Sequence, residues 1–365
     1  MTFEINTFIR AHILEMPAYQ PIYPLDVIVE ELGLSEDKLI KLDANENPFG
    51  ALPEVLAALA SLQDSHIYPD PESRRVRALL AKYHQVSEQS IVLGAGADEL
   101  IDLIMRLVID PGDKIINCPP TFGMYSFDAS LNQAKVIDVP RCSDFSLDVE
   151  GIQYAIQEYQ PKLIFLANPN NPDGKLVPPE IIKVLLTYPL LVVLDEAYFN
   201  FSEAEDDWIQ KVPEYGNLIV LRTFSKWAGL AGLRIGYGVF PENFVPVMMK
   251  AKQPYNISVA AQEAARVSLL NIEQLVQNTT HIILERQRLF EKLLEIPWLI
   301  PRPSSANFIL CKVTRKNALH VKQRLREKGI LIRHFNKPGL DDHIRISVGK
   351  PEHTDRIIDI LKIME

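Results

Sequence analysis

Two cationic side chains lie in a glycine-broken stretch and could act together on a ligand that carries an aldehyde and an anionic group. Lys226 follows Ser225 shortly after the apolar run from Leu218 to Leu221, and Arg234 comes eight residues later. An uncharged lysine can bind an aldehyde as a Schiff base, while a hydroxyl group and a second cation bind a phosphate. Because most lysines are solvated surface groups, this interpretation depends on what the rest of the chain offers.

A glycine-rich turn upstream could bind the phosphate of the same ligand. Gly94 to Glu99 follows the apolar run at 91–93 and opens a helical pattern, so the free amides of Ala97 and Asp98 could face an anion. Taken alone, the segment is more simply explained as a glycine turn whose acidic residues complement the helix dipole.

Two further segments could contact an aromatic ring that carries the aldehyde. Asp195 follows five apolar residues, where a strand would place its carboxylate against a protonated pyridine nitrogen. Tyr198 and Asn171 could donate hydrogen bonds to the phenolic oxygen of the ring. A helix cap at Asp195 and an Asx-turn at Asn171 would explain either residue taken singly. The anchoring lysine, the phosphate pocket and the ring-binding groups together predict pyridoxal phosphate as the cofactor.

Aromatic and arginine side chains could complete the site. Phe122 could stack on the ring and Tyr68 could reach the phosphate, although either could instead be core or turn packing. Arg345 lies between two isoleucines, so its side chain leaves the predicted strand on the face opposite to theirs. Its planar fork suits a carboxylate or a phosphate of the substrate. Arg333 ends another predicted strand, and the commoner alternative for an arginine on an edge strand is a surface salt bridge.

The composition argues against several classes of protein. Acidic residues outnumber basic ones by 47 to 38, and the net charge of −9 argues against a generic nucleic-acid or anionic-membrane partner. Cys118, Cys142 and Cys311 are widely spaced, which indicates reduced thiols and neither a disulfide framework nor a zinc site. No apolar run approaches the roughly 18 residues that span a bilayer, and no signal peptide is recognisable. We therefore expect a cytoplasmic protein without a bound metal.

Short β-rich runs alternate with helical patterns between about Leu42 and Phe240, which is typical of a mostly parallel sheet covered by helices on both faces. The clearest runs lie at 91–93, 114–117, 163–166, 190–194, 218–221 and 235–239. Each candidate segment except Arg234 begins where one of these runs ends. Ligands of open α/β sheets bind beyond the carboxyl ends of the strands, so these segments are expected to form one site.

The length of 365 residues favours two domains or one large α/β unit. We expect a large cofactor-binding domain at residues 40–253, and a smaller α+β domain formed by residues 1–39 together with 254–365. In the second part, one long helix is expected from about Ser258 to Leu294. It is followed by predicted strands at 306–311, 330–333 and 344–348, a helix at 318–328 and a last helix from Glu352.

These segments resemble the motifs of the fold-type I pyridoxal-phosphate aminotransferases, and within them those of the histidinol-phosphate aminotransferases. The resemblance covers nearly the whole chain. It extends over residues 42–50, Tyr68-Pro-Asp-Pro71, 94–99, 169–174, 195–198, 223–238, 331–333 and 344–349. The lysine, asparagine and aspartate segments are specific for the superfamily, whereas residues 43–50 and the two arginines point to the narrower group. Asp173 stands in Pro-Asp-Gly where Pro-Thr-Gly is more usual, a departure that changes a turn and not a catalytic group.

The resemblance implies a role for each candidate. Lys226 would carry the cofactor and move a proton, Asp195 would pair with the pyridine nitrogen, and Asn171 and Tyr198 would hold the ring oxygen. Phe122 would stack on the ring, where some members of the family have tyrosine. The phosphate would be bound by Ser225, Arg234, the amides of Ala97 and Asp98, and Tyr68 from the partner subunit of a homodimer with shared active sites.

The resemblance also implies a reaction. L-Histidinol phosphate and 2-oxoglutarate would give imidazole acetol phosphate and L-glutamate, a step of histidine biosynthesis. One pocket must then accept a phosphate ester from one substrate and a carboxylate from the other. Arg345 could bind either anion, and Arg333 would add the second positive charge that a dianionic phosphate favours. Tyr19 is placed like the amino-terminal tyrosine of the family that closes over the site.

Three alternatives share parts of this pattern. An aminotransferase for aromatic amino acids such as phenylalanine and tyrosine would have nearly all of these motifs. A threonine-phosphate decarboxylase also binds a phosphorylated substrate, but the 43–48 segment resembles the aminotransferases more closely. A non-catalytic cofactor-binding module of a transcription regulator would require a basic DNA-binding domain in front, for which the sequence offers no candidate.

Overall fold

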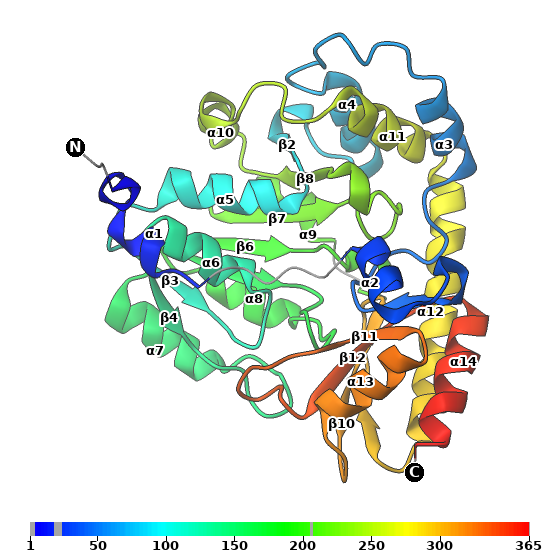
Figure 1. Ribbon diagram of the computed structural model, residues 1–365. Helices are drawn as coiled ribbons and strands as arrows, with labels where there is room; N and C mark the ends of the chain where they lie inside the picture. The colour runs from blue at the N-terminus through cyan, green and yellow to red at the C-terminus, as the bar shows by residue number, and fades with distance from the viewer. Residues whose placement is uncertain (1–3, 18–23, 205–206, 365) are drawn as a thin grey trace.

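The computed structural model describes residues 4–17, 24–204 and 207–364, which form two sheets surrounded by helices (Figure 1). The larger sheet has seven strands in the order β2-β8-β7-β6-β5-β3-β4, and its neighbours are parallel except where they involve β8. The strands are β2 (Ile91–Gly94), β3 (Lys114–Asn117), β4 (Lys135–Asp138), β5 (Leu163–Ala167), β6 (Leu191–Asp195), β7 (Leu218–Thr223) and β8 (Gly236–Val239).

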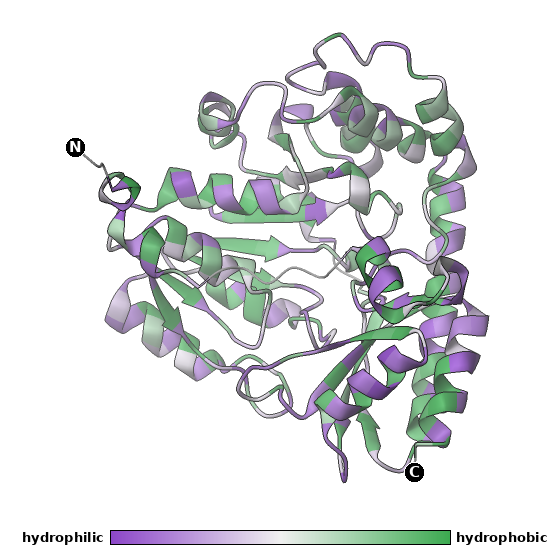
Figure 2. Ribbon diagram, in the orientation of Figure 1, coloured by the Kyte–Doolittle hydropathy of each residue, from purple (hydrophilic) through white to green (hydrophobic). Residues whose placement is uncertain are grey.

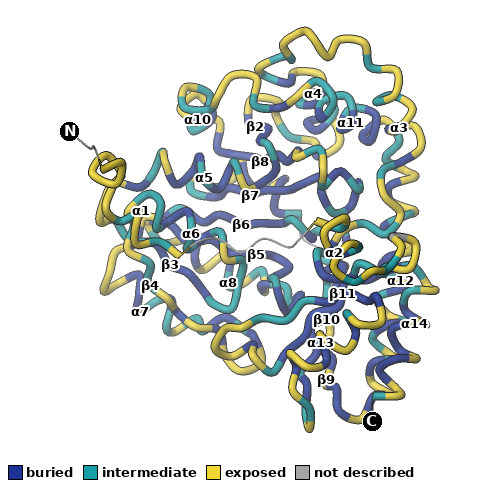
Figure 3. Tube along the Cα trace, viewed as in Figure 1, coloured by how far each residue is buried: buried dark blue, intermediate teal, exposed yellow. Residues whose placement is uncertain are grey.

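Helices cover both faces of the larger sheet because its central strands are apolar on both sides. In β5, Leu163 and Phe165 pack in one cluster with α5, α6 and α10, whereas Ile164 and Leu166 pack in the other with α4, α7 and α8. Figure 2 shows the same strands as hydrophobic, and Figure 3 shows them as buried. The helices are α4 (Arg74–His84), α5 (Ala97–Val108), α6 (Met124–Leu131), α7 (Val149–Tyr159), α8 (Pro179–Leu185), α9 (Trp208–Lys211) and α10 (Val245–Ala251).

The smaller sheet has five strands in the order β1-β11-β12-β10-β9. β1 is parallel to β11, and the other pairs are antiparallel. The strands are β1 (Ile40–Leu42), β9 (Leu299–Pro301), β10 (Phe308–Val313), β11 (Ile330–His334) and β12 (His343–Ser347). Helix α13 (Ala318–Glu327) packs on β11 and β12. The predicted fold class, a helix-covered, mostly parallel sheet with a smaller α+β part, is confirmed. The exact division into domains stays a prediction, and its first boundary lies at β1, which is a strand of the smaller sheet.

The long helix expected from Ser258 to Leu294 is divided in two, so this prediction was wrong in one respect. The chain forms α11 (Val259–Leu270) and α12 (Ile272–Leu294), with Asn271 between them outside helical geometry at φ −114° and ψ 37°. The Asn271 side chain donates from Nδ2 to the carbonyl oxygen of Val267 at 2.8 Å. The backbone amide of Asn271 donates to the same oxygen at 3.2 Å, so the carbonyl of Val267 accepts two bonds where α11 ends. Helix α11 packs on α3 (Pro53–Ala60) and α4, whereas α12 contacts β9, β10 and α14 (Pro351–Lys362).

The remaining described elements are short. They are α1 (Ala11–Glu15), α2 (Leu25–Leu32) and the 3-10 turns η1 (Ile5–Phe8), η2 (Glu36–Lys38), η3 (Glu88–Ser90), η4 (Phe199–Phe201), η5 (Val212–Glu214) and η6 (Ala231–Leu233). Within the described ranges, none of the helices is both long and apolar enough to cross a bilayer.

Candidate active site

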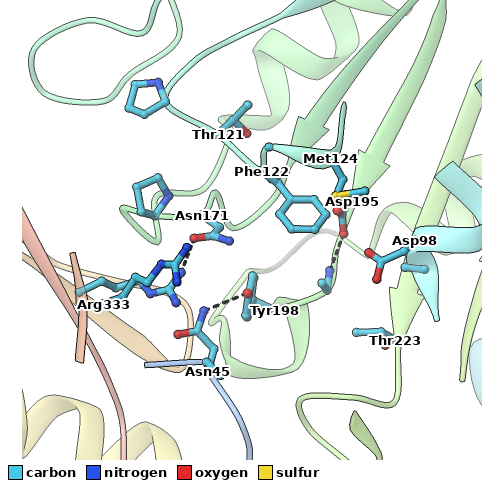
Figure 4. A pocket seen from close by; sticks show the side chains of 18 of the residues that line it. Asn45, Asp98, Thr121, Phe122, Met124, Asn171, Asp195, Tyr198, Thr223 and Arg333 are labelled. Atoms are coloured by element: carbon cyan, nitrogen blue, oxygen red, sulfur yellow. Dashed lines mark hydrogen bonds between the residues drawn. The ribbon is translucent and has the colours of Figure 1, made fainter. Parts of the chain in front are cut away.

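Most of the predicted site residues meet in one cavity of about 580 Å³, lined by the carboxyl ends of strands of the larger sheet and by β11 and β12 of the smaller one. Figure 4 shows Asn171 and Arg333 on one side of this cavity, Asp98 and Asp195 on the other, and Phe122 between them in the view. The predicted residues that line it are Ala97, Asp98, Phe122, Asn171, Asp195, Tyr198, Ser225, Lys226, Arg234, Arg333 and Arg345.

One end of the cavity is built for an anion. Helix α5 begins directly after Gly96, which has a φ of +82° and provides no side-chain cap, so the amides of the first turn remain available. A Cβ atom at Gly96 would lie 2.5 Å from Nη2 of Arg234, so only glycine allows this close approach. The buried Ser225 is held by Thr223, whose hydroxyl donates to its Oγ at 2.9 Å. Arg234 also pairs with Asp98, at 2.9 Å between Nη2 and Oδ2.

Asp195 places a buried carboxylate in the cavity at the end of β6. The phenol of Tyr125 donates to its Oδ2 at 2.7 Å, and the amide of Ala197 donates to its Oδ1 at 3.1 Å. Burial raises the pKa of Asp195 to about 6, against the opposing effect of the Tyr125 hydrogen bond. Among the residues that the structure describes, Asp195 has no ion pair at salt-bridge distance. A cationic group in the cavity would therefore be drawn to it.

The amine of Lys226 lies over the ring of Tyr198, and both residues line the cavity. The Nζ of Lys226 donates to the carbonyl oxygen of Ala44 at 3.3 Å and is 6.0 Å from the Tyr198 ring centroid. Asn45 donates from Nδ2 to the Tyr198 hydroxyl oxygen at 3.0 Å. Because that oxygen accepts from Asn45, its own proton is free to point elsewhere, and the cavity is the open direction.

Two arginines form the opposite wall. Arg333 and Arg345 are directly paired in the register of β11 and β12. Arg345 is 5% exposed, and its guanidinium donates to Asn171 Oδ1 at 2.6 Å and to the carbonyl oxygen of Asp43 at 2.8 Å. Burial lowers the pKa of Arg345 to about 10, and Arg333 acts in the same direction. Neither arginine has a carboxylate within salt-bridge distance in the described part of the chain. Two adjacent cations without a counter-ion are a receptor for an anion.

The matches to known proteins agree with this geometry. Residues 37–361 match the model of the family described as aminotransferase class I and II. The chain belongs to this family. The chloroplastic histidinol-phosphate aminotransferase of Nicotiana tabacum is 52% identical over 360 residues, covering 98% of this chain and 86% of the relative. The histidinol-phosphate aminotransferase of Roseiflexus castenholzii is 47% identical, covering 99% of both chains.

A solved structure extends the likeness from sequence to fold. Histidinol-phosphate aminotransferase from Sinorhizobium meliloti, crystallised in complex with pyridoxal-5'-phosphate, superposes with a TM-score of 0.88 at 27% identity. The match covers 98% of each chain. The fold of this aminotransferase is therefore one on which a relative binds that cofactor.

One predicted residue lies away from the cavity wall. Tyr68 is 79% exposed and stacks on Tyr255 with ring centroids 4.6 Å apart, and it does not line the cavity. Tyr19 lies outside the described residues. The described residues contain no group of three or more histidine, cysteine, aspartate or glutamate side chains that could hold a metal ion.

Two residues of this aminotransferase site were not predicted individually. Tyr125 comes three residues after Phe122, and this spacing places both rings at the start of α6, with centroids 5.5 Å apart. Asn45 lies in the 43–50 segment that carried the resemblance, and it has a φ of +56° and is buried. The spacing signal could have indicated Tyr125, whereas the contact between Asn45 and Tyr198 joins residues too distant in sequence to be paired from one chain.

Proposed function

We propose that this aminotransferase transfers the amino group of L-histidinol phosphate to 2-oxoglutarate, giving imidazole acetol phosphate and L-glutamate in histidine biosynthesis. The names of the relatives support the substrate, since both curated relatives described above are called histidinol-phosphate aminotransferases. We also propose a cytoplasmic location, although the Nicotiana relative is named chloroplastic.

The observation that carries the proposal is the register pair of Arg333 and Arg345 in the cavity wall. A carboxylate needs one bidentate arginine, whereas a phosphate monoester carries nearly two negative charges and can contact two. Arg345 keeps both of its protein hydrogen bonds on acceptors that are not ionised carboxylates. Its positive charge is therefore left for the substrate.

The groups of the cavity fit pyridoxal phosphate. The buried Asp195, without a cationic partner among the described residues, suits a protonated pyridine nitrogen. The Ser225 hydroxyl, the Arg234 guanidinium and the first amides of α5 suit the phosphate. When bound, this cofactor supplies an electron sink for bonds at the α-carbon of the substrate.

Lys226 is the residue that moves the proton. Its Nζ donates to the carbonyl oxygen of Ala44 and contacts no carboxylate among the described residues. As a free amine, Nζ would accept the proton that leaves the α-carbon of the substrate and hold it for return. The same amine is the group that would anchor the cofactor aldehyde before substrate arrives.

Asn171 and Tyr198 orient the ring from its oxygen side. The Oδ1 atom of Asn171 accepts from Arg345, so its Nδ2 is left to donate to the ring oxygen. The Tyr198 hydroxyl accepts from Asn45 and can donate its proton to the same oxygen. Asn171 thereby joins the anion-binding arginine to the cofactor.

We further propose a homodimer in which Tyr68 of one protomer reaches the phosphate in its partner's site. The support is that Tyr68 is exposed and lies outside the cavity of its own subunit. Tyr19 remains a predicted closing residue for the same cavity.

A half-reaction assay tests the function. Holoenzyme is mixed with L-histidinol phosphate, L-phenylalanine or threonine phosphate, and the loss of the cofactor's long-wavelength absorbance is followed. We expect the fastest loss with histidinol phosphate and none with Lys226→Ala, while the control Lys82→Ala, an exposed lysine of α4, reacts like the wild type. A strong preference for phenylalanine would assign the protein to aromatic amino acids, and release of carbon dioxide from threonine phosphate would identify a decarboxylase.

A further inference from the structure

A hydrogen-bond chain that includes the cavity-lining Thr121 joins two loops that carry site residues. Asn170 is fully buried, and its Nδ2 donates to the carbonyl oxygen of Pro120 at 3.1 Å and to the carboxylate of Asp173. The hydroxyl of Thr121 donates to Oδ1 of Asn170 at 2.8 Å. Both Nδ2 and Oδ1 of the Asn170 side chain therefore have hydrogen-bond partners. A rotation of this amide group would break these bonds.

The carboxylate of Asp173 ends this chain, and it is only 2% exposed. One oxygen accepts from Asn170, and Oδ1 accepts from the amide of Lys175 at 2.9 Å. Both oxygens thus act as acceptors, as the two oxygens of an ionised carboxylate can. An asparagine at this position would turn an NH₂ group toward one of these two donors, whichever way its amide faced.

Arg141 supplies the opposite charge in the same interior region. It is 9% exposed and donates from Nε to the carbonyl oxygen of Cys118 at 3.2 Å and from Nη1 to that of Phe145 at 3.1 Å. Burial raises the pKa of Asp173 and lowers that of Arg141, and each charge opposes the shift of the other. Each buried group therefore has an opposite charge nearby that favours its ionised form.

The chain lies next to two proposed cofactor contacts. Thr121 precedes Phe122, and Asn170 precedes Asn171. We propose that Asp173 is a positioning residue: by holding Asn170 against Thr121 and Pro120, it fixes the placement of Asn171 relative to Phe122, with Arg141 as its counter-charge. This inference rests on the proposed function for the role of the cofactor. It gives the unusual aspartate of the 169–174 segment a role beyond the shape of a turn.

The test uses full-length Asp173→Asn and Thr121→Val, which break the chain at opposite ends without adding bulk. Asp144→Asn is the matched control, because Asp144 pairs with Lys175 in the same region but is exposed. Three quantities are measured without substrate. The first is the melting temperature of the apoprotein. With pyridoxal phosphate as the only ligand, the others are the affinity for the cofactor and the pH at which the absorbance of the bound cofactor titrates. KM and kcat for the donor are measured separately.

Both chain-breaking variants should bind the cofactor about tenfold more weakly, which corresponds to about 1.4 kcal/mol. A displaced Asn171 donates poorly to the ring oxygen, so the deprotonated oxygen is less favoured and the spectroscopic titration should move up by about one pH unit. KM for the donor should rise because Arg345 loses a well-placed partner. Asp144→Asn should leave all of these values unchanged.

A lower melting temperature with an unshifted titration and unchanged affinity in Asp173→Asn would mean a structural role only, and the inference would be wrong. If Asp173→Asn does not fold, Thr121→Val decides by the same criterion. Wild-type protein that fails to bind pyridoxal phosphate at all would instead remove the proposed function. The two failures are therefore distinguishable.

Discussion

Asp195 and Tyr125 act as one unit at the centre of the cavity. The hydroxyl of Tyr125 donates a hydrogen bond to the carboxylate at 2.7 Å, and the tyrosine is fully buried and stacks on Phe165. Burial favours the neutral acid, whereas a bond donated to the carboxylate favours the ion. Because the pKa of Asp195 is about 6, the loss of one hydrogen bond to its carboxylate would bring the pKa close to neutral pH.

Tyr125→Phe should raise the pKa of Asp195 further, by about one unit. Below that pKa the carboxyl group is neutral and no longer pairs with a protonated pyridine. Cofactor affinity falls at low pH, and the pH at which it begins to fall should therefore be higher in this variant. Absorbance titrations with the cofactor at a series of pH values measure this shift. Tyr154→Phe, at an exposed tyrosine of α7, is the control. If affinity begins to fall at the same pH in Tyr125→Phe as in the wild type, Tyr125 does not tune Asp195.

The arginine pair predicts a division of labour between substrates. Arg345→Ala should lower kcat/KM for both histidinol phosphate and glutamate by tenfold or more, since a charge-assisted bond contributes about 1.5–3 kcal/mol. Arg333→Ala should lower it mainly for the phosphorylated donor, because the second charge matters for a dianion. Arg106→Ala, an exposed arginine of α5, serves as the control. Equal losses on both substrates in Arg333→Ala would contradict the assignment.

Site residues that belong to a local sequence motif could be predicted from the sequence. Lys226, Asp195 and Asn171 each follow an apolar run, and the structure brings them to one cavity. The partners that set their ionisation and direction were not predicted. Asn45 reaches Tyr198 across 153 positions of sequence, and no local pattern reports such a contact.

Where helix α6 packs against α5, a buried carboxyl group lies in an environment that disfavours its charge. Asp128 on α6 is 3% exposed, and its Oδ2 has no hydrogen-bond partner among the described residues. Burial raises the pKa of Asp128 to about 7, and Asp102 and Asp98 of α5 add to the rise. The folded protein thus binds a proton at Asp128 that the unfolded chain has already released.

Because the folded pKa lies above the unfolded value of 3.8, stability from this group falls as pH rises from about 4 to about 7. Asp128→Asn removes the charge at every pH. Its free energy of unfolding, relative to the wild type, should therefore improve between pH 5 and pH 8 by roughly 1–2 kcal/mol once solvent screening is allowed for. Urea titrations at the two pH values measure this difference. The exposed Asp64→Asn should show none, and a pH-independent difference for Asp128→Asn would refute the explanation.

Elements with strong periodicity were predictable, and weak ones were not. The buried strands β5, β6 and β7 stand out as apolar runs, whereas β4 has no fully buried residue and was missed. The division between α11 and α12 lies at the single residue Asn271, so the hydrophobic pattern continues through it. The role of β1 could not be predicted, because its partner β11 lies almost 300 residues later.

In the whole molecule, the cavity is walled by two sheets, and the proposed dimer adds a third contributor. Mixing subunits tests this arrangement. Lys226→Ala lacks the anchoring amine, and Tyr68→Ala lacks the residue proposed to serve the partner's site. A heterodimer of the two contains one intact site, so a re-equilibrated equimolar mixture should regain about a quarter of wild-type activity.

The expected mass in solution is twice the chain mass of 41.4 kDa, measured by light scattering. If Tyr68 serves its own subunit, each heterodimer has no intact site. The mixture would then show no more than the average of the two variants, which would remove the shared site from the proposal.

The pairing of β1 with β11 also has a consequence for biosynthesis. Strands of the larger sheet all lie between Ile91 and Val239, so a nascent chain can complete that sheet, with Lys226 in place, while its last third is still being translated. The smaller sheet must wait, because its first strand emerges early and the strands it joins come near the end. Ribosome-bound intermediates would thus hold the lysine end of the cavity before either arginine exists, and a premature stop codon would leave an enzyme half without its anion receptor.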